Sequence, residues 1–226
     1  MINLKNANFN VFKHKVVITG KLVSKSQIHI GSGEDDERRV QLFITFKYED
    51  RKIPYIPGSS LKGVFRSTIG QIYSNDVESY LFGSNDPDPK KACAAHVKIF
   101  DALPINWQQE HIPLYTKPGV AIDRRTGAAS PGMLFSIEVL PPEIKFEFRM
   151  ILENIDLEDR NDMNRAAIRF LINELKNGYV AIGAKTTGGL GRVILEEVQV
   201  RTISNEDIKQ DKGYRELKDW EVGRDD

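Results

Sequence analysis

The chain has 226 residues, and 32 Lys and Arg are balanced by 32 Asp and Glu, so the formal net charge is zero. Composition alone therefore does not indicate a nucleic-acid binder, and any basic surface must be local. The length is enough for one large domain or two small ones. We expect a single domain over residues 1–203, followed by a charged tail over residues 204–226 that lies on the surface or docks through Trp220.

The single cysteine, Cys93, excludes an internal disulfide framework and a Cys-rich zinc site, and it is typical of a reducing compartment. No stretch resembles a signal peptide or approaches the roughly 20 apolar residues that span a bilayer. We therefore expect a cytoplasmic protein with no membrane partner, in which Cys93 is buried or half-buried.

Apolar periodicity predicts alternating strands and helices along the chain. The main elements are strands at residues 15–23, 95–100, 143–152 and 192–200, a helix at residues 59–73, and a helix from residue 159 or 161 to Gly178. In the clearest strand, Phe146, Phe148 and Met150 alternate with charged residues. The order strand, helix, strand, strand, helix, strand is that of a ferredoxin-like α+β fold, with an antiparallel sheet and helices on one face.

The remaining segments are predicted as insertions in this order. They are an extended piece at 27–30, a loop at 31–39, a strand at 40–48, a polar loop at 84–91, an irregular stretch at 103–118 and a short strand at 179–182. Residues 133–139 are predicted to form a hairpin with residues 143–152 about Pro141 and Pro142.

Residues 53–67 combine an extended run, a turn and a helix start. Ser59 or Ser60 is expected to cap the helix, whose outer side carries Lys62 and Arg66 one turn apart. Unpaired N–H groups at a helix start beside two cations can seat a phosphate. The alternative is an ordinary capped helix with a solvated Lys and Arg.

A second candidate is the glycine loop, residues 183–191, with Lys185, Thr186 and the following Arg192. Glycines allow backbone N–H groups to approach phosphates closely, although the spacing is neither that of a Walker loop nor that of a Rossmann motif. A glycine-rich hairpin without a ligand is the alternative.

A third candidate is the charged turn with Asp123, Arg124 and Arg125. Either Arg can reach a phosphate or stack on a base while the carboxylate orients it, and the alternative is a surface ion pair. The histidines show no metal-ligand spacing, so no metal site is expected. His29 could act as a base, and Asp35 and Asp36 lie in an acidic run that could hold a divalent cation but is also typical of a solvated loop.

These segments together resemble the RAMP superfamily of CRISPR-associated proteins, in particular the backbone subunits of type III (Csm and Cmr) effector complexes. The matching motifs are IPGSSLKGVFR at residues 56–66, LFG at 81–83, IDRRTG at 122–127 and GLGRV at 189–193. The resemblance implies a modified RNA-recognition-motif fold of ferredoxin type that grips guide RNA (crRNA) by its backbone. It also implies as partners target RNA, neighbouring RAMP subunits stacked along the RNA, and the large polymerase-like subunit.

By this resemblance the helix start with Ser59, Ser60, Lys62 and Arg66 lines the guide-RNA path. So does the glycine loop, through Lys185, Thr186, Gly188, Gly189, Gly191 and Arg192, with Arg124 and Arg125 nearby. Replacing any one of Lys62, Arg66, Lys185 and Arg192 by Ala is expected to weaken RNA binding to a similar degree.

Catalytic relatives cleave target RNA with an Asp in the loop after the His-Ile-Gly strand, and this chain has Gln41 where we align that Asp. An amide cannot supply the charge that a carboxylate gives to a metal or to a general base. We therefore expect a non-catalytic, guide-binding subunit that needs no cofactor. The alternatives are a Mg- or Mn-dependent endoribonuclease using Asp35 or Asp36, and a guide-precursor processing enzyme using His29.

Overall fold

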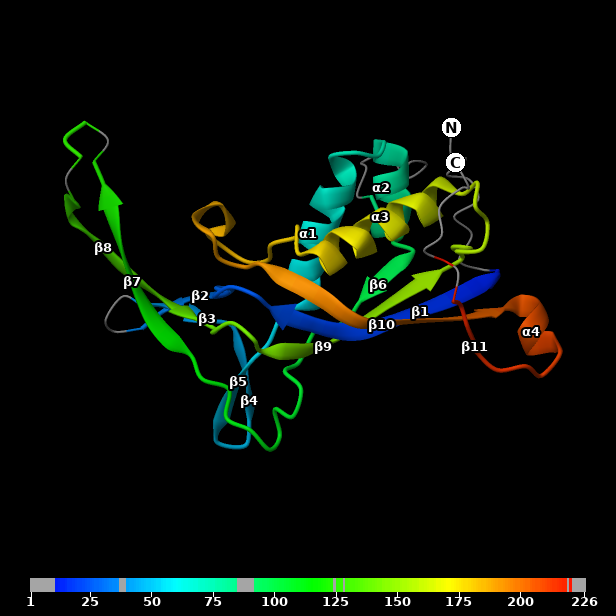
Figure 1. The fold of residues 1–226 in the computed structure, drawn as a ribbon, viewed down its shortest axis with the longest axis horizontal. Helices are drawn as coiled ribbons and strands as arrows, with labels where there is room; N and C mark the ends of the chain where they lie inside the picture. Colours follow the sequence, from blue (N-terminus) through cyan, green and yellow to red (C-terminus); the bar gives the residue numbers. More distant parts are fainter. Residues whose placement is uncertain are drawn as a thin grey trace.

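The structure is a computed structural model that describes residues 11–36, 40–84, 92–123, 125–127, 129–218 and 220; at residues 121, 122 and 129–134 it describes the backbone course alone. Its centre is a five-stranded sheet with the helices packed on one face (Figure 1). A second, four-stranded sheet extends from one end of this body.

The central sheet has the strand order of a ferredoxin-like fold. Its neighbours across the sheet are β11 (Arg215–Glu216), β10 (Val193–Ser204), β1 (His14–Ser24), β9 (Lys145–Glu153) and β6 (Val97–Ile99). β1 lies antiparallel between β10 and β9, and β6 lies antiparallel to β9. α1 (Gly58–Gly70), α2 (Asn75–Phe82) and α3 (Met163–Asn177) cover one face (Figure 1). The predicted α+β, ferredoxin-like arrangement is therefore confirmed.

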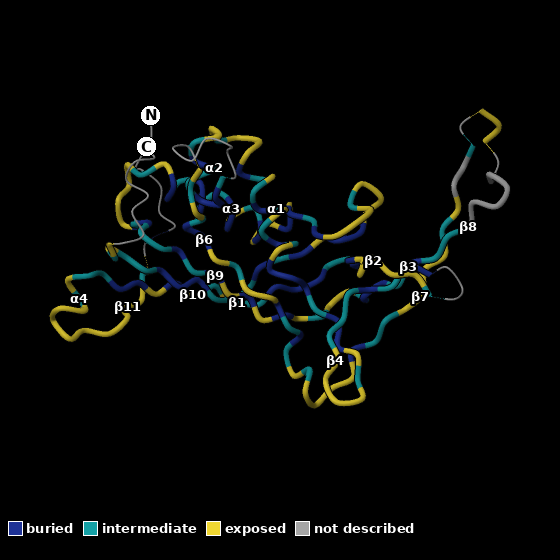
Figure 2. The backbone as a smooth tube through the Cα atoms, turned by 180° about the vertical axis from the view of Figure 1, so that it is seen from behind, coloured by how far each residue is buried: buried dark blue, intermediate teal, exposed yellow. Residues whose placement is uncertain are grey.

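The core lies between this sheet and the helices (Figure 2). α1 places Leu61, Phe65 and Ile69 there at helical spacing, and all three are fully buried. α3 begins where the Asp162 carboxylate accepts a hydrogen bond from the Asn164 N–H at 2.8 Å, and ends at a left-handed Gly178. None of the helices in the described part of the chain is long and apolar enough to span a membrane.

The second sheet has the order β2 (Gly31–Asp35), β3 (Val40–Phe43), β8 (Ala129–Val139) and β7 (Tyr115–Ile122). β7 and β8 pair antiparallel and project from the body as a hairpin, which we call the arm (Figure 1). The predicted hairpin between residues 133–139 and 143–152 is therefore wrong. Pro141 and Pro142 carry the chain from one sheet to the other, since prolines cannot form the favoured two-residue hairpin turns.

Other local predictions also differ from the structure. Residues 31–35 were expected in a loop but form β2, every residue of which is exposed. The expected strand at 40–48 is divided into β3 and β4 (Thr45–Tyr48), and β4 pairs with β5 (Arg51–Pro54). β7 begins inside the stretch expected to be irregular, and residues 179–182 contribute only an isolated bridge from Ala181 to Arg192.

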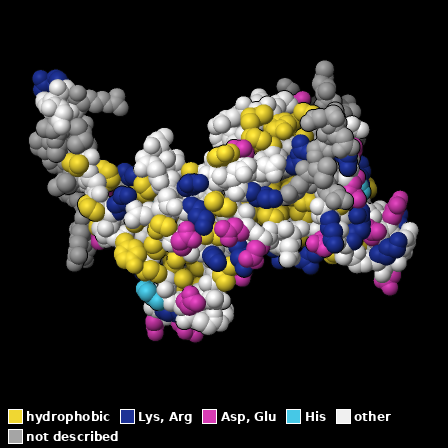
Figure 3. Space-filling model, in the orientation of Figure 1, with side chains coloured by type: hydrophobic (Ala, Val, Ile, Leu, Met, Phe, Trp, Pro, Cys, Tyr) yellow, Lys and Arg dark blue, Asp and Glu magenta, His cyan; other side chains and the backbone are white. Residues whose placement is uncertain are grey.

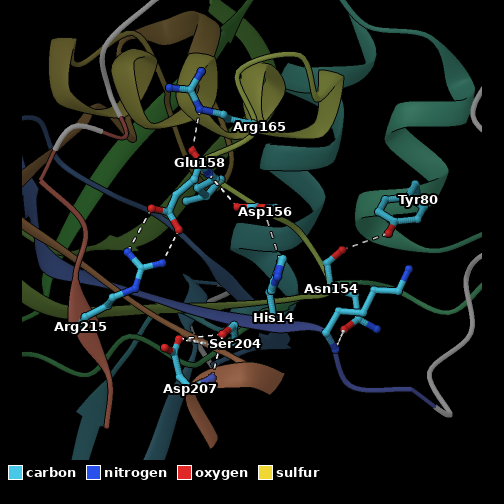
Figure 4. A network of polar contacts seen from close by, with 11 residues as sticks. His14, Tyr80, Asn154, Asp156, Glu158, Arg165, Ser204, Asp207 and Arg215 are labelled. Atoms are coloured by element: carbon cyan, nitrogen blue, oxygen red, sulfur yellow. Dashed lines mark hydrogen bonds and ion pairs between the residues drawn. The ribbon is translucent and has the colours of Figure 1, made fainter. Parts of the chain in front are cut away.

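The tail after β10 folds back onto the body. It forms α4 (Asn205–Lys209), which Ser204 and Asp207 start as a capping box, and then β11 beside β10. Trp220 is 5% exposed and joins the core, and its carbonyl accepts a hydrogen bond from buried Arg165 at 2.9 Å. Figure 4 shows Arg215 of β11 paired through two hydrogen bonds with Glu158. The tail is thus docked through Trp220, one of the two arrangements expected.

Candidate nucleic-acid interface

The outward face of α1 opens into a pocket of about 430 Å³, which we call the α1 pocket. Ser59, Lys62, Gly63 and Arg66 line one side of it. Phe82, Gly83 and Ser84, after α2, line the other side together with residues 93–95. The fold thus brings the motifs at residues 56–66 and 81–83 to one hollow surface. Cys93 is half-buried there, and burial raises the pKa of its thiol, so the pocket holds a neutral thiol.

The two cations of the α1 pocket have different surroundings. Arg66 Nε lies 2.6 Å from Glu78 Oε1 of α2, and the Arg66 side chain is 43% exposed. Lys62 is half-buried and makes no ion pair with any described residue. Lys62 therefore offers an uncompensated positive charge, whereas the charge of Arg66 is neutralised locally.

The start of α1 is capped by a residue that the sequence did not suggest. The N-cap is Pro57, which is followed by no serine side-chain cap, so the expectation for Ser59 or Ser60 is wrong. The Gly58 N–H instead donates to the Asp101 carboxylate at 2.7 Å. A Cβ at Gly58 would lie 2.5 Å from the Ile99 carbonyl oxygen, so the close approach requires glycine. Asp101 already occupies one donor of the expected phosphate seat.

The glycine loop is held by its backbone against residues 27–29. Gly191 N–H donates to the Gln27 carbonyl and Ala184 N–H to the His29 carbonyl, both at 2.8 Å. Residues Thr186, Thr187 and Gly188 form a short 3-10 turn, and the exposed Gly188 and Gly189 have no atom within 4 Å of an added Cβ. Lys185 Nζ lies 3.8 Å from the centre of the Phe135 ring, a cation–π contact with the arm. The loop is therefore anchored at its base and open at its tip.

Arg192 follows the glycine loop and lies beside the end of α3. Its Nε donates to the Gly178 carbonyl at 3.3 Å, where a cation also interacts favourably with the helix dipole. The residue is exposed, so its guanidinium retains donors on the solvent side. Arg192 therefore has a structural partner as well as a free surface.

The charged turn predicted at residues 123–127 lies at the tip of the arm, far from the α1 pocket (Figure 1). Asp123 accepts hydrogen bonds there from the backbone N–H groups of Arg125 and Thr126, at 2.7 and 3.1 Å. The carboxylate thus shapes the turn through its backbone. Arg125 is exposed, and Arg124 lies outside the described residues. Figure 3 shows a basic side chain at this tip, and elsewhere on this face basic and acidic side chains alternate.

The acidic candidates occupy the β2–β3 hairpin. Asp35 is exposed on β2 directly opposite Gln41 on β3. Asp36 instead supports the turn, because its carboxylate accepts a hydrogen bond from the Val40 N–H at 2.8 Å. No three His, Cys, Asp or Glu side chains gather as metal ligands within the described residues. Of the two aspartates, Asp35 is the one placed to act on a ligand.

Comparison with known proteins identifies the class to which this fold and surface belong. The family model of the RAMP superfamily matches residues 21–194, and the chain belongs to this superfamily. Among curated proteins, the chain is 27% identical over 218 residues to the "CRISPR system Cms endoribonuclease Csm3" of Streptococcus thermophilus. That alignment covers 86% of this chain and 94% of the relative.

Proposed function

We propose that this chain is a guide-RNA-binding backbone subunit of a type III CRISPR effector complex. The observation that carries the proposal is the α1 pocket, in which a RAMP motif presents Lys62 and Arg66 on the open face of a helix. Membership of the superfamily and similarity to a Csm3 protein along nearly its whole length support it. Neighbouring RAMP subunits, target RNA and the large polymerase-like subunit would be its partners.

Backbone gripping makes a specific prediction for the purified full chain. An electrophoretic shift assay should show binding of single-stranded RNAs of unrelated sequence with similar affinity, because phosphate contacts carry no sequence information. The affinity should fall as salt rises, and the double variant Lys62→Ala, Arg66→Ala should show a shallower salt dependence. The proposal is overturned if no RNA is shifted, or if the double variant keeps the wild-type salt dependence.

A second candidate function is metal-dependent cleavage of target RNA, and the position of Asp35 favours it. Asp35 projects from an exposed strand opposite Gln41, so one carboxylate is available where we expected an amide. A Mg²⁺ or Mn²⁺ ion there would draw its other ligands from RNA phosphates and water, as Mg²⁺ commonly does. The name of the Csm3 relative includes endoribonuclease activity, which is consistent with this candidate.

The two candidates are separated by assembling the complex on a labelled target with magnesium or manganese. We expect binding without cleavage at the phosphate that this subunit covers, for wild type and for Asp35→Asn alike. Gln41→Asp is expected to restore little cutting, because catalytic groups must be placed to a fraction of an ångström. Cleavage by wild type that is lost in Asp35→Asn would establish the endoribonuclease instead. Asp36 is left unchanged because its side chain supports the hairpin turn.

A further inference from the structure

The ring of His29 is fixed in both orientation and tautomer. The residue is 3% exposed, and its Nδ1 lies 2.6 Å from the Glu138 carbonyl oxygen. A carbonyl can only accept, so Nδ1 carries the hydrogen and donates it. The edge of the Phe43 ring packs against the imidazole, with 6.4 Å between the ring centres. In the neutral ring Nε2 is therefore an acceptor, and its direction is set by the fold.

The space in front of Nε2 is kept open by Gly31. A Cβ added at Gly31 would lie 3.5 Å from His29 Nε2, and Gly31 itself is exposed at the start of β2. Among the described residues Nε2 has no hydrogen-bond partner. Gly31 does not have a left-handed backbone, so its conformation does not require glycine. What the glycine supplies is access to the imidazole.

This acceptor lies beneath the glycine loop and close to positive charge. The His29 carbonyl accepts the Ala184 N–H, and a Cβ at Gly183 would lie 2.2 Å from the same oxygen. Lys185 follows in the loop, and Lys117 Nζ of the arm lies 2.7 Å from Gln27 Oε1. A polyanionic strand attracted by these two lysines would pass within reach of Nε2.

We propose that His29 Nε2 accepts a hydrogen bond from a ribose 2′-hydroxyl of the bound strand, and that this contact makes the site prefer RNA over DNA. The inference rests on the proposed RNA-binding function and adds a basis for recognising the sugar. Phosphate oxygens have no hydrogen to donate, whereas the 2′-hydroxyl is a donor on every nucleotide of RNA and is absent from DNA. A contact of this kind is independent of sequence, as backbone gripping requires.

The test compares binding of oligouridine and oligodeoxyuridine of equal length to the full chain by fluorescence anisotropy. Gly31→Ala places a methyl group where the hydroxyl would sit and leaves His29 intact, and His29→Phe removes the acceptor while keeping an aromatic ring. Each variant should bind oligouridine about two- to tenfold more weakly, the effect of one lost hydrogen bond, with unchanged affinity for oligodeoxyuridine. Gly213→Ala is the matched control in the tail, because nothing lies within 4 Å of its added Cβ. It should bind both strands as wild type does.

The outcomes separate this inference from the function on which it rests. If wild type binds no RNA, the proposed function and the inference both fail. If wild type prefers RNA and Gly31→Ala keeps the same ratio of the two affinities, the inference alone is overturned. Equal weakening toward both strands by Gly31→Ala would also overturn it, because a packing defect or a contact to the base would affect RNA and DNA alike. Should His29→Phe fail to fold, Gly31→Ala still decides the question.

Discussion

Lys62 and Arg66 lie one turn apart on α1, but only Arg66 is held by an acidic neighbour. A cation that is already paired must exchange its partner to bind a phosphate, and the exchange leaves Glu78 close to a new negative charge. The net electrostatic gain from Arg66 is therefore smaller than from Lys62. The earlier expectation that each cation contributes equally is refined by this difference.

The salt dependence of RNA binding should reveal this difference between the two cations. We expect Lys62→Ala to reduce the magnitude of the salt slope by about 0.7, the value for one contact to a single strand, and Arg66→Ala to reduce it by less. Glu78→Gln should strengthen binding, because it frees the guanidinium. Fluorescence anisotropy over a salt series measures all three variants.

Lys98→Ala is the control for that series, since Lys98 lies on β6 and its Nζ pairs with Glu153 at 2.8 Å. It should leave the salt slope at the wild-type value. Equal slopes for Lys62→Ala and Arg66→Ala, together with no gain from Glu78→Gln, would contradict the distinction between a paired and an unpaired cation.

At the scale of the element, α1 depends on a cap supplied from beyond β6. Removing the carboxylate by Asp101→Ala should lower the free energy of unfolding by about 0.5–2 kcal/mol, the usual effect of losing an N-cap. Gly58→Ala should cost roughly 1–3 kcal/mol, because its Cβ would overlap the Ile99 carbonyl. Urea unfolding followed by circular dichroism measures both. Asp101→Asn keeps an acceptor and should lie between wild type and Asp101→Ala; a wild-type value for Asp101→Ala would rule out the capping role.

The same helix shows how far the sequence predicts this protein. The position of α1 and its buried stripe follow from local apolar spacing, and so do the strands of the central sheet. The cap and the ion pair do not, because Asp101 and Glu78 are 43 and 12 residues away from their partners in the chain. Such contacts exist only once the tertiary fold is formed.

The second sheet was missed for a related reason. β2 is exposed throughout, so it lacks the alternating apolar residues that predict a strand. β3 pairs in parallel with β8, almost 100 residues further on according to the register of Val40 with Ser136. For the candidate site, the motif residues were found from the sequence, whereas the separation of the arm tip from the α1 pocket required the fold (Figure 1).

At the scale of the whole molecule, the tail closes the structure by joining β10 to the start of α3. Leu217 N–H donates to the Val200 carbonyl at 2.8 Å, and Arg165 donates from α3 to the carbonyls of Leu157 and Trp220. Arg215 and Glu158 add an ion pair across the same junction (Figure 4). Docking of the tail is therefore coupled to ionisation of one carboxylate.

This coupling predicts how stability depends on pH. The hydrogen bond from Arg215 holds the pKa of Glu158 below its ordinary value of 4.5. Since the folded-state pKa is depressed, the stabilisation is fully present above the unfolded-state value and is lost as the pH falls through the folded-state value. Both side chains are about half exposed, so we expect Glu158→Gln to cost no more than about 1 kcal/mol near neutral pH and close to nothing at roughly pH 3.

The comparison between wild type and Glu158→Gln is needed because another carboxylate shifts the other way. Burial raises the pKa of Asp162 at the start of α3, so Asp162 favours folding as the pH falls. Asp162 is present in both proteins, and its contribution cancels in the difference between their unfolding free energies. Urea unfolding at both pH values gives this difference directly. A difference that stays constant between the two pH values would show that Glu158 acts through packing, and the ion pair would then contribute nothing to docking of the tail.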